Sequence, residues 1–282
     1  MIKIEHTLFA LPFALLGAFM AARGAPTAAQ AAWITLAMVG ARSAAMAFNR
    51  LVDVDFDRRN PRTSGRALPR GLVSKGFVIA FIVASAGVLV ASAAMLNPLA
   101  FRLSPVALVI VFFYSWTKRF TWWSHFFLGL SLACAPVGAW VAIRGEVTTT
   151  PLMLGLAVAL WVAGLDILYA CQDVEFDRRA ALYSIPQRFG VKGALWTSAL
   201  AHAAMVGILA WLFRSEGLGR VSLGGVGAVA LLLVYEHSLV TPTDLSRVNT
   251  AFFAVNGWIS ILLFATTSVD ILMFHSLKTV SP

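Results

Sequence analysis

The chain has 282 residues, of which 59% are hydrophobic and only 12% are charged, and its formal net charge is +9. Soluble globular proteins carry about a quarter charged residues, so this composition excludes that class and predicts a polytopic membrane protein. The positive charge does not indicate nucleic-acid binding, because Lys and Arg gather in short loops between apolar segments and no stretch interleaves basic and aromatic residues on a polar face.

Nine apolar segments are candidates for membrane-spanning helices, each of which needs about 20 mostly apolar residues. In chain order they cover residues 7–22, 28–48, 76–96, 101–116, 122–143, 151–171, 193–213, 221–240 and 251–274. We expect the first to be a spanning helix rather than a removed signal peptide, because no cleavage site with a soluble domain follows it. The sequence therefore predicts an all-α integral membrane protein.

The loops between nine spans alternate between the two sides of the membrane. Fifteen of the 22 Lys and Arg residues then fall on one side and six on the other, while Arg42 lies inside a span. Cytoplasmic loops carry an excess of Lys and Arg, so we expect the first side, with the N-terminus, to be cytoplasmic. The two cysteines, Cys134 and Cys171, lie in or beside apolar segments and indicate no disulfide framework.

One acidic motif occurs twice. Residues 53–59 read DVDFDRR and residues 173–179 read DVEFDRR, and each copy follows a long apolar segment. Internal repeats are typical of membrane proteins built from two related halves. We therefore expect two pseudo-repeats of one helical bundle rather than two independent domains.

The first copy offers oxygen ligands at helical spacing. If the preceding helix continues, Asn49, Asp53 and Asp57 lie on one helical face, whereas Asp55 points away. One amide and two carboxylates suit Mg²⁺, which commonly takes one or two carboxylates and completes its shell with water and substrate phosphate. The alternative is a solvated, charged helix end without a ligand.

In the second copy, Asp166, Asp173 and Asp177 form a similar helical stripe. Asp166 is the most informative of the three because it lies inside an apolar segment, where a carboxylate needs a partner. Tyr169 and Gln172 are spaced to line the same cavity. The alternative for Asp166 is a structural hydrogen bond to a neighbouring helix. Together the two copies predict facing sites for divalent cations, and so a phosphorylated substrate at the membrane surface.

The motifs N-x-x-x-D-x-x-x-D at 49–57 and D-x-x-x-x-x-x-D-x-x-x-D at 166–177 resemble the UbiA superfamily of intramembrane prenyltransferases. The resemblance extends to residues 60–63 (NPRT), 66–71 (RALPRG) and 114–119 (YSWTKR). It implies about nine transmembrane helices around a central cavity, in one transmembrane prenyltransferase domain over residues 1–282. It also implies Mg²⁺-dependent binding of a polyprenyl diphosphate and prenylation of an acceptor, usually an aromatic one.

Ionisation of an allylic diphosphate requires stabilisation of the departing pyrophosphate, which Mg²⁺ provides as a Lewis acid. We expect the catalytic carboxylates to be Asp53, Asp57, Asp166, Asp173 and Asp177, and the metal ligands to be Asn49, Asp53, Asp57, Asp173 and Asp177. Fixed cations add electrostatic stabilisation, and the candidates for binding the diphosphate are Lys118, Arg119, Arg62 and Arg66. The resemblance makes Lys118 the strongest of these.

Arg42 lies inside the second apolar segment, seven residues before Asn49 and so on the same helical face. A buried guanidinium favours a carboxylate partner. An aromatic acid acceptor would supply one, so we predict that Arg42 binds the acceptor, with Tyr169 beside it. The alternative is an internal salt bridge, for instance to Asp166 or Glu236.

The leading interpretation is a polyprenyltransferase that acts on a ring carbon of an aromatic acid such as 4-hydroxybenzoate, in quinone biosynthesis. We expect it in a bacterial inner membrane with its active site facing the cytoplasm. Residues 183–186 read YSIP, where ubiquinone-branch enzymes tend to have Lys-Ser-Thr, so a naphthoate-type acceptor for menaquinone stays open. A secondary transporter is a more distant alternative, because internal repeats and intramembrane acids also occur in that class.

Besides the two substrates and membrane lipid, the sequence implies no protein partner. It leaves open the acceptor, the length of the prenyl chain, the oligomeric state and the group that removes the ring proton. The histidines share no ligand-like spacing, so we expect them to be interface or packing residues: His6, His125, His202, His237 and His275. The basic loop over residues 58–74 is expected to cap the diphosphate and exclude water.

Overall fold

The computed structural model describes residues 7–275, which form helices joined by short loops and contain no β-strand. The long helices are α1 (Thr7–Ala22), α2 (Ala28–Val52), α4 (Lys75–Ala94), α5 (Pro98–Thr117), α6 (Ser124–Arg144), α7 (Thr149–Ala170), α9 (Ile185–Ser215), α10 (Arg220–Ser238) and α12 (Asn256–Asp270). The short ones are α3 (Val54–Arg59), α8 (Val174–Arg179), α11 (Val248–Thr250), the 3₁₀-helix η2 (Cys171–Asp173) and the π-helices η3 (Ala251–Val255) and η4 (Ile271–His275).

Eight helical segments of the described residues are long and apolar enough to cross a membrane. The ninth expected span, α1, has 16 residues and is shorter than the others. The prediction of an all-α integral membrane protein with about nine transmembrane helices is therefore confirmed.

The helix ends follow local capping chemistry. The side chain of Thr27 accepts a hydrogen bond from the Gln30 backbone and that of Gln30 bonds back to Thr27, which forms a capping box at the start of α2. The side chains of Asn97 and Ser184 each accept one backbone N–H at the start of α5 and α9, and each of these helices has a proline in its first two positions. Gly145 ends α6 in the left-handed conformation, with φ of 66°.

Small residues bring the helices together. A Cβ atom on Gly129 of α6 would lie 2.1 Å from the carbonyl oxygen of Ala159 in α7. A Cβ atom on Gly40 of α2 would lie 2.7 Å from the carbonyl oxygen of Ser85 in α4. Close backbone approach at glycine is the usual way in which membrane helices gain packing contact, because lipid offers them no hydrophobic driving force.

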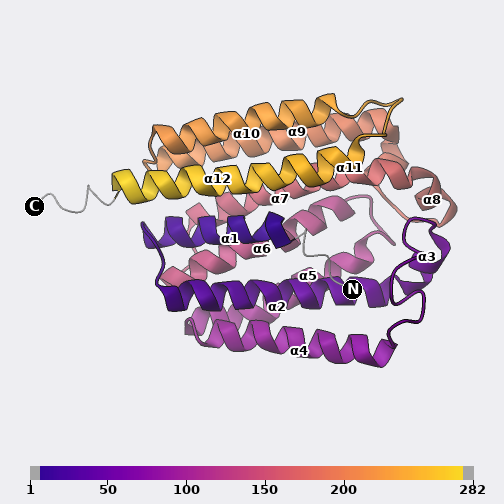
Figure 1. The fold of residues 1–282 in the computed structure, drawn as a ribbon, viewed down its shortest axis with the longest axis horizontal. Coiled ribbons are helices and arrows are strands. Elements are labelled where there is room, and N and C mark those ends of the chain that lie inside the picture. Colours follow the sequence, from indigo (N-terminus) through magenta and orange to yellow (C-terminus); the bar gives the residue numbers. More distant parts are fainter. Residues whose placement is uncertain (1–6, 276–282) are drawn as a thin grey trace, which may run out of the picture.

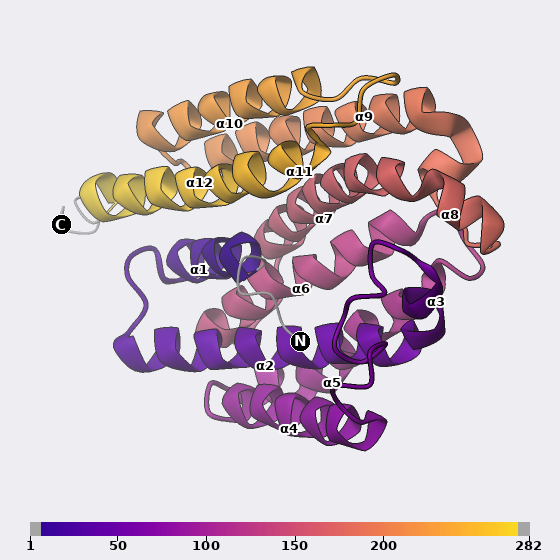
Figure 2. The ribbon, with the colours of Figure 1, turned by 45° about the vertical axis from the view of Figure 1, so that its right-hand side comes forward.

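The helices form two groups (Figures 1 and 2). Helices α2, α4 and α5 lie on one side, α9, α10 and α12 on the other, and α1, α6 and α7 lie between them. α7 packs against both α6 and α9, while α1 packs against α6 and α12. α3 and α8 lie at the same end of the bundle in both views, so the fold brings the two copies of the acidic motif to one end.

The two copies also share their backbone geometry. α2 ends before Asp53, which has φ −94° and ψ 9°, and the six-residue helix α3 follows. η2 ends at Asp173, which has φ −100° and ψ 3°, and the six-residue helix α8 follows. The helix therefore does not continue regularly through Asn49, Asp53 and Asp57. The helix is interrupted at the first aspartate of each copy, Asp53 and Asp173, and the chain continues as the short helix α3 or α8.

Candidate active site

A cavity of about 940 Å³ runs between the helices and ends beside the acidic motifs. Its apolar part is lined by side chains of α2, α4, α5 and α6, among them Met38, Leu89, Leu103 and Leu132. Its polar part carries Asn49, Arg50, Arg62, Arg66, Tyr114, Lys118, Asp166, Tyr169 and Asp173. The cavity thus joins an apolar space to a charged end.

Asp53 belongs to the charged end through its partners. Nδ2 of Asn49 donates to Oδ2 of Asp53 at 3.0 Å, and Nη2 of Arg119 donates to Oδ1 at 3.3 Å. Arg119 also donates to the backbone oxygen of Val52 at 2.8 Å. Burial raises the pKa of Asp53 above its usual value, and the charges of Lys118 and Arg119 oppose this without cancelling it.

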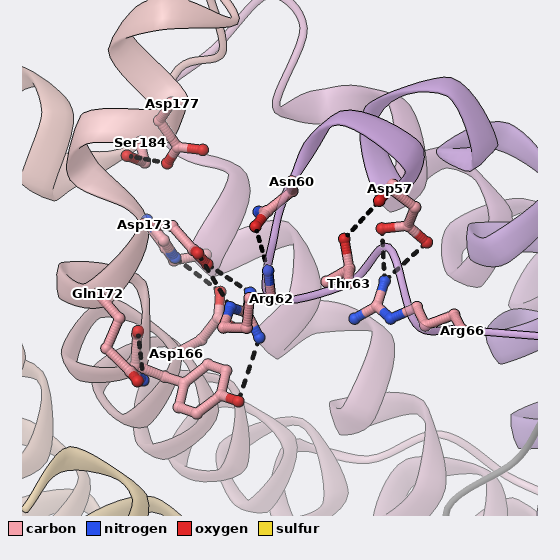
Figure 3. A network of polar contacts seen from close by, with 12 residues as sticks. Asp57, Asn60, Arg62, Thr63, Arg66, Asp166, Gln172, Asp173, Asp177 and Ser184 are labelled. Carbon is pink, nitrogen blue, oxygen red and sulfur yellow. Dashed lines mark hydrogen bonds and ion pairs between the residues drawn. The ribbon is translucent and has the colours of Figure 1, made fainter. Parts of the chain in front are cut away.

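Asp57 is buried and bound to a single arginine. Nη1 of Arg66 lies 2.6 Å from Oδ1 and 2.8 Å from Oδ2 of Asp57 (Figure 3). The hydroxyl of Thr63 donates to the backbone oxygen of Asp57 at 3.1 Å. The loop that follows α3 is therefore folded back onto the first acidic motif.

Arg62 in the same loop binds the second motif (Figure 3). Its Nε donates to Oδ1 of Asp173 at 3.0 Å, its Nη2 to Oδ2 at 2.5 Å, and its Nη1 to the hydroxyl of Tyr169 at 3.2 Å. Burial lowers the pKa of Arg62, but its bonds to Asp173 outweigh burial and the net pKa lies above the usual value. The third aspartate of this motif, Asp177, accepts a hydrogen bond from the hydroxyl of Ser184 at 2.9 Å.

Lys118 lies between the two copies. It is half-buried directly after α5 and lines the cavity. Burial lowers its pKa, but the carboxylates of Asp177, Asp166, Asp173 and Asp53 raise it more, so the ammonium group stays charged at neutral pH. A cation at this place faces both acidic motifs.

Arg42 lines the same cavity from α2. Its Nε atom is buried and has no hydrogen-bond partner, and no ion pair of Arg42 occurs among residues 7–275. The salt bridges weighed from the sequence are not formed: Asp166 binds a histidine, and Glu236 is fully buried and forms no ion pair in the described part of the chain.

His125 was expected to be an interface or packing residue, and the structure corrects this expectation. His125 is fully buried in the first turn of α6, and its Nδ1 lies 2.6 Å from Oδ2 of Asp166. This is the hydrogen bond to a neighbouring helix that was weighed for Asp166. His202 and His237, which bind each other at 3.0 Å, are the packing residues expected. His6 and the side chain of His275 lie outside the described residues. The sequence did contain a signal for a role of His125, because an ionisable residue inside a predicted membrane span is often functional.

The aromatic wall beside the second motif was also missed. Phe252 and Phe253 of the π-helix η3 line the cavity, and the ring of Phe252 packs on Tyr169 with centroids 4.3 Å apart. π-helical turns are rare and frequent at functional sites. Periodicity places residues 251–255 in an ordinary span, so nothing in the sequence indicated the turn.

Among residues 7–275 no three His, Cys, Asp or Glu side chains come together in a group that could hold a metal ion. The donor set does fit Mg²⁺ in its common mode, in which one or two carboxylates per ion are completed by water and substrate phosphate. Asn49 with Asp53 on one side and Asp173 on the other supply such oxygens. The residues do not fit a site in which protein side chains supply all of the metal ligands.

Comparison with known proteins agrees with this arrangement. The profile of the UbiA prenyltransferase family matches residues 10–262. The chain is 29% identical over 259 residues to the 4-hydroxybenzoate octaprenyltransferase of Aromatoleum aromaticum, which covers 91% of this chain and 86% of that protein.

Two solved structures are similar to the fold. The structure of a UbiA homolog from Aeropyrum pernix K1 superimposes with a TM-score of 0.88 at 37% identity, over 96% of this chain and 100% of the other. A UbiA homolog from Archaeoglobus fulgidus bound to DMAPP and Mg²⁺ superimposes with a TM-score of 0.74 at 23% identity, over 94% of each chain.

Proposed function

The chain belongs to the UbiA prenyltransferase family, and on that premise we propose that it transfers a polyprenyl group from its diphosphate to a ring carbon of an aromatic acid such as 4-hydroxybenzoate, with Mg²⁺ as the cofactor. One observation carries the proposal. A single cavity is lined at its charged end by Asn49, Asp166 and Asp173 of the two motifs and, on α2, by Arg42, whose buried Nε atom has no hydrogen-bond partner among the described residues.

The charged end takes the diphosphate of the donor. Asn49, Asp53, Asp57, Asp173 and Asp177 would hold Mg²⁺, which when bound stabilises the charge on the departing pyrophosphate. Lys118, Arg62, Arg66 and Arg119 would bind the phosphate oxygens. Guanidinium groups form bidentate bonds with phosphate as readily as with carboxylate, so the arginines can exchange their aspartate partners for the donor while the aspartates turn to the metal.

The apolar part of the cavity takes the isoprenoid chain, which gains stability when its surface leaves water or headgroups. The loop between α3 and α4 covers the charged end, because Arg62 and Arg66 tie it to Asp173 and Asp57. Exclusion of water at this place protects an allylic cation from hydrolysis.

Arg42 takes the carboxylate of the acceptor, and Tyr169 lies in the wall beside the second motif. A buried guanidinium without a partner is costly, and a carboxylate ligand supplies the charge that it needs. The relative from A. aromaticum is named for 4-hydroxybenzoate, which supports a monocyclic acid. The naphthoate-type acceptor is the alternative that the same arginine would serve.

We further propose that residues 1–282 act as one domain in a bacterial inner membrane, with the acidic end facing the cytoplasm. The excess of Lys and Arg in the loops at that end supports this orientation. In a secondary transporter the acidic residues lie near the membrane midplane, where substrate can reach them from both sides. Asn49, Asp53, Asp57, Asp173 and Asp177 lie in the last turn of α2 or beyond the ends of α2 and α7, and only Asp166 lies within a long helix, which supports the enzyme.

The acceptor is tested with membranes that contain the protein, Mg²⁺, radiolabelled geranyl diphosphate and either 4-hydroxybenzoate or 1,4-dihydroxy-2-naphthoate. Label in the monocyclic acid alone is the expected result. Label in the bicyclic acid alone would move the protein to a menaquinone-type reaction. Label in neither acid would contradict the proposed aromatic acceptor.

A further inference from the structure

The side chain of His125 has no part in the scheme above, yet it lies directly behind the cavity wall. Its Nδ1 atom is 2.6 Å from Oδ2 of Asp166. The histidine side chain is 0% exposed, whereas that of Asp166 is 22% exposed and lines the cavity. One oxygen of the carboxylate is therefore held from behind, while part of the group still faces the cavity.

The fold fixes which nitrogen of His125 carries the proton. The backbone N–H of Ile185 donates to Nε2 at 3.3 Å. A nitrogen that accepts an N–H bond has no proton of its own, so the proton of the neutral ring lies on Nδ1 and points at Asp166. The ring is thus a donor to the carboxylate and not a second acceptor.

Two features of the fold place the His125 ring between α7 and α9. One turn after His125, the backbone of α6 meets α7, because a Cβ atom on Gly129 would lie 2.1 Å from the carbonyl oxygen of Ala159. At the other side of the ring, Ile185 is the first residue of α9, and its neighbour Ser184 donates to Asp177. The backbone at the start of α9 therefore orients the histidine.

Resting on the proposed function, we propose that His125 is a positioning residue for prenyl transfer. Its Nδ1–H holds Asp166 so that the other carboxylate oxygen accepts a hydrogen bond from the ring hydroxyl of the acceptor. Arg42 on α2 and Asp166 on α7 line the same cavity. An acceptor ring with a carboxylate at one end and a hydroxyl at the other would bind Arg42 through its carboxylate and Asp166 through its hydroxyl.

The chemical benefit follows from the direction of this hydrogen bond. A hydroxyl that donates to a carboxylate becomes more electron-rich, and it passes electron density to the ring carbon beside it. The C–O bond of the donor breaks and pyrophosphate leaves with the electron pair, so that the ring carbon forms its new C–C bond to the allylic cation. The proton on that ring carbon is then lost to the released pyrophosphate or to water, which restores the aromatic ring. If the carboxylate of Asp166 rotates away, the acceptor loses this hydrogen bond. Misplacement of a reacting group by about 1 Å can lower the rate roughly 100-fold.

Two substitutions separate the two nitrogens of the ring. His125→Asn keeps an N–H donor near the place of Nδ1, and His125→Gln keeps an acceptor near the place of Nε2 but loses the donor to Asp166. We expect His125→Gln to lower kcat on the order of 10- to 100-fold with the donor KM unchanged, and His125→Asn to retain most of the wild-type kcat.

The effect must pass through Asp166. In the Asp166→Asn background, His125→Gln should therefore cause no further loss, because coupled residues are not additive. His202→Gln is the matched control: His202 is 2% exposed on α9 and bonds to the backbone oxygen of Trp161, away from the cavity. Its kcat should equal that of the wild type. All rates are given per folded protein, measured by size-exclusion chromatography.

Wild-type turnover by His125→Gln, an equal loss in both His125 variants, or a full additional loss in the Asp166→Asn background would each overturn the proposal. A second readout does not need activity. ¹⁵N NMR of histidine-labelled wild-type protein in bilayers, with His125 assigned by its absence in His125→Asn, should show a protonated Nδ1 and an unprotonated Nε2. A protonated Nε2 would overturn the proposal even if the acceptor assignment holds. Absence of transfer by the wild type would instead contradict the proposed function.

Discussion

The guanidinium of Arg62 binds the carboxylate of Asp173 through two hydrogen bonds, 3.0 Å from Nε to Oδ1 and 2.5 Å from Nη2 to Oδ2. Arg62 lies in the loop after α3 and Asp173 ends η2, so the pair joins the two halves of the bundle at the charged end of the cavity (Figure 3). It makes the loop a cover for the site.

Replacement of Arg62 tests whether the loop after α3 covers the site. Arg62→Ala leaves Asp173, which is 10% exposed, without its cation. Charge-assisted hydrogen bonds contribute about 1.5–3 kcal/mol, reduced here because the arginine side chain is 35% exposed. We expect the unfolding temperature to fall by a few degrees and the KM for the donor to rise roughly tenfold. Arg58→Ala is the control, because Arg58 pairs with exposed Asp55 at 3.5 Å. Equal effects of the two variants would contradict the account.

The acidic motifs contain their own controls. Asp53→Asn and Asp173→Asn remove a proposed metal ligand with little change of shape, and we expect each to lower Mg²⁺-dependent turnover by at least about 100-fold. Asp55 and Glu175 occupy the same position in the two copies of the motif, and their side chains are 74% and 73% exposed. The variants Asp55→Asn and Glu175→Gln should therefore turn over substrate at nearly the wild-type rate. Undiminished turnover of Asp53→Asn and Asp173→Asn would contradict the metal assignment.

Arg42 should act on the acceptor alone. Arg42→Ala removes a charge-assisted bond of about 1.5–3 kcal/mol, which corresponds to a rise of roughly 10- to 100-fold in the acceptor KM. The KM for geranyl diphosphate in the same assay is the internal control and should not change. A KM for 4-hydroxybenzoate equal to that of the wild type would remove Arg42 from the acceptor site.

Helix packing around His125 and Asp166 can be tested at Gly129. Gly129→Ala places a methyl group 2.1 Å from the oxygen of Ala159, so α6 and α7 must separate. Overpacking of this kind costs about 1–3 kcal/mol, and we expect a lower unfolding temperature together with a lower kcat. Gly207→Ala is the control, since nothing lies within 4 Å of the added atom. An unchanged unfolding temperature for Gly129→Ala would show that this contact is not tight.

The spans and the pairing of the two acidic motifs could be predicted from the sequence, because runs of apolar residues and a repeated heptapeptide are local features. The start of α9 was placed at residue 193, whereas the helix begins at Ile185. The extra segment contains Gln187 and Arg188, and Gly190 interrupts it with φ of 70°. A search for apolar segments cannot detect a polar stretch of this kind at the start of a helix.

Contacts between helices could not be predicted. His125 and Asp166 are 41 residues apart, and only the backbone approach of α6 and α7 brings them together. The break at Asp53 was equally hidden, because its spacing from Asn49 suits a continuous helix. The pairing of Arg62 with Asp173 depends on the path of a loop, which no periodicity encodes.

Product formation by the purified protein in liposomes shows whether prenyl transfer to the acid depends on Mg²⁺. Radiolabelled geranyl diphosphate and 4-hydroxybenzoate are supplied with Mg²⁺, or with a chelator in its place, and labelled product and pyrophosphate are both quantified. We expect equal amounts of labelled acid and pyrophosphate with Mg²⁺, and neither with the chelator. Transfer that continues after chelation, or pyrophosphate release without any labelled acid, would contradict the proposed function.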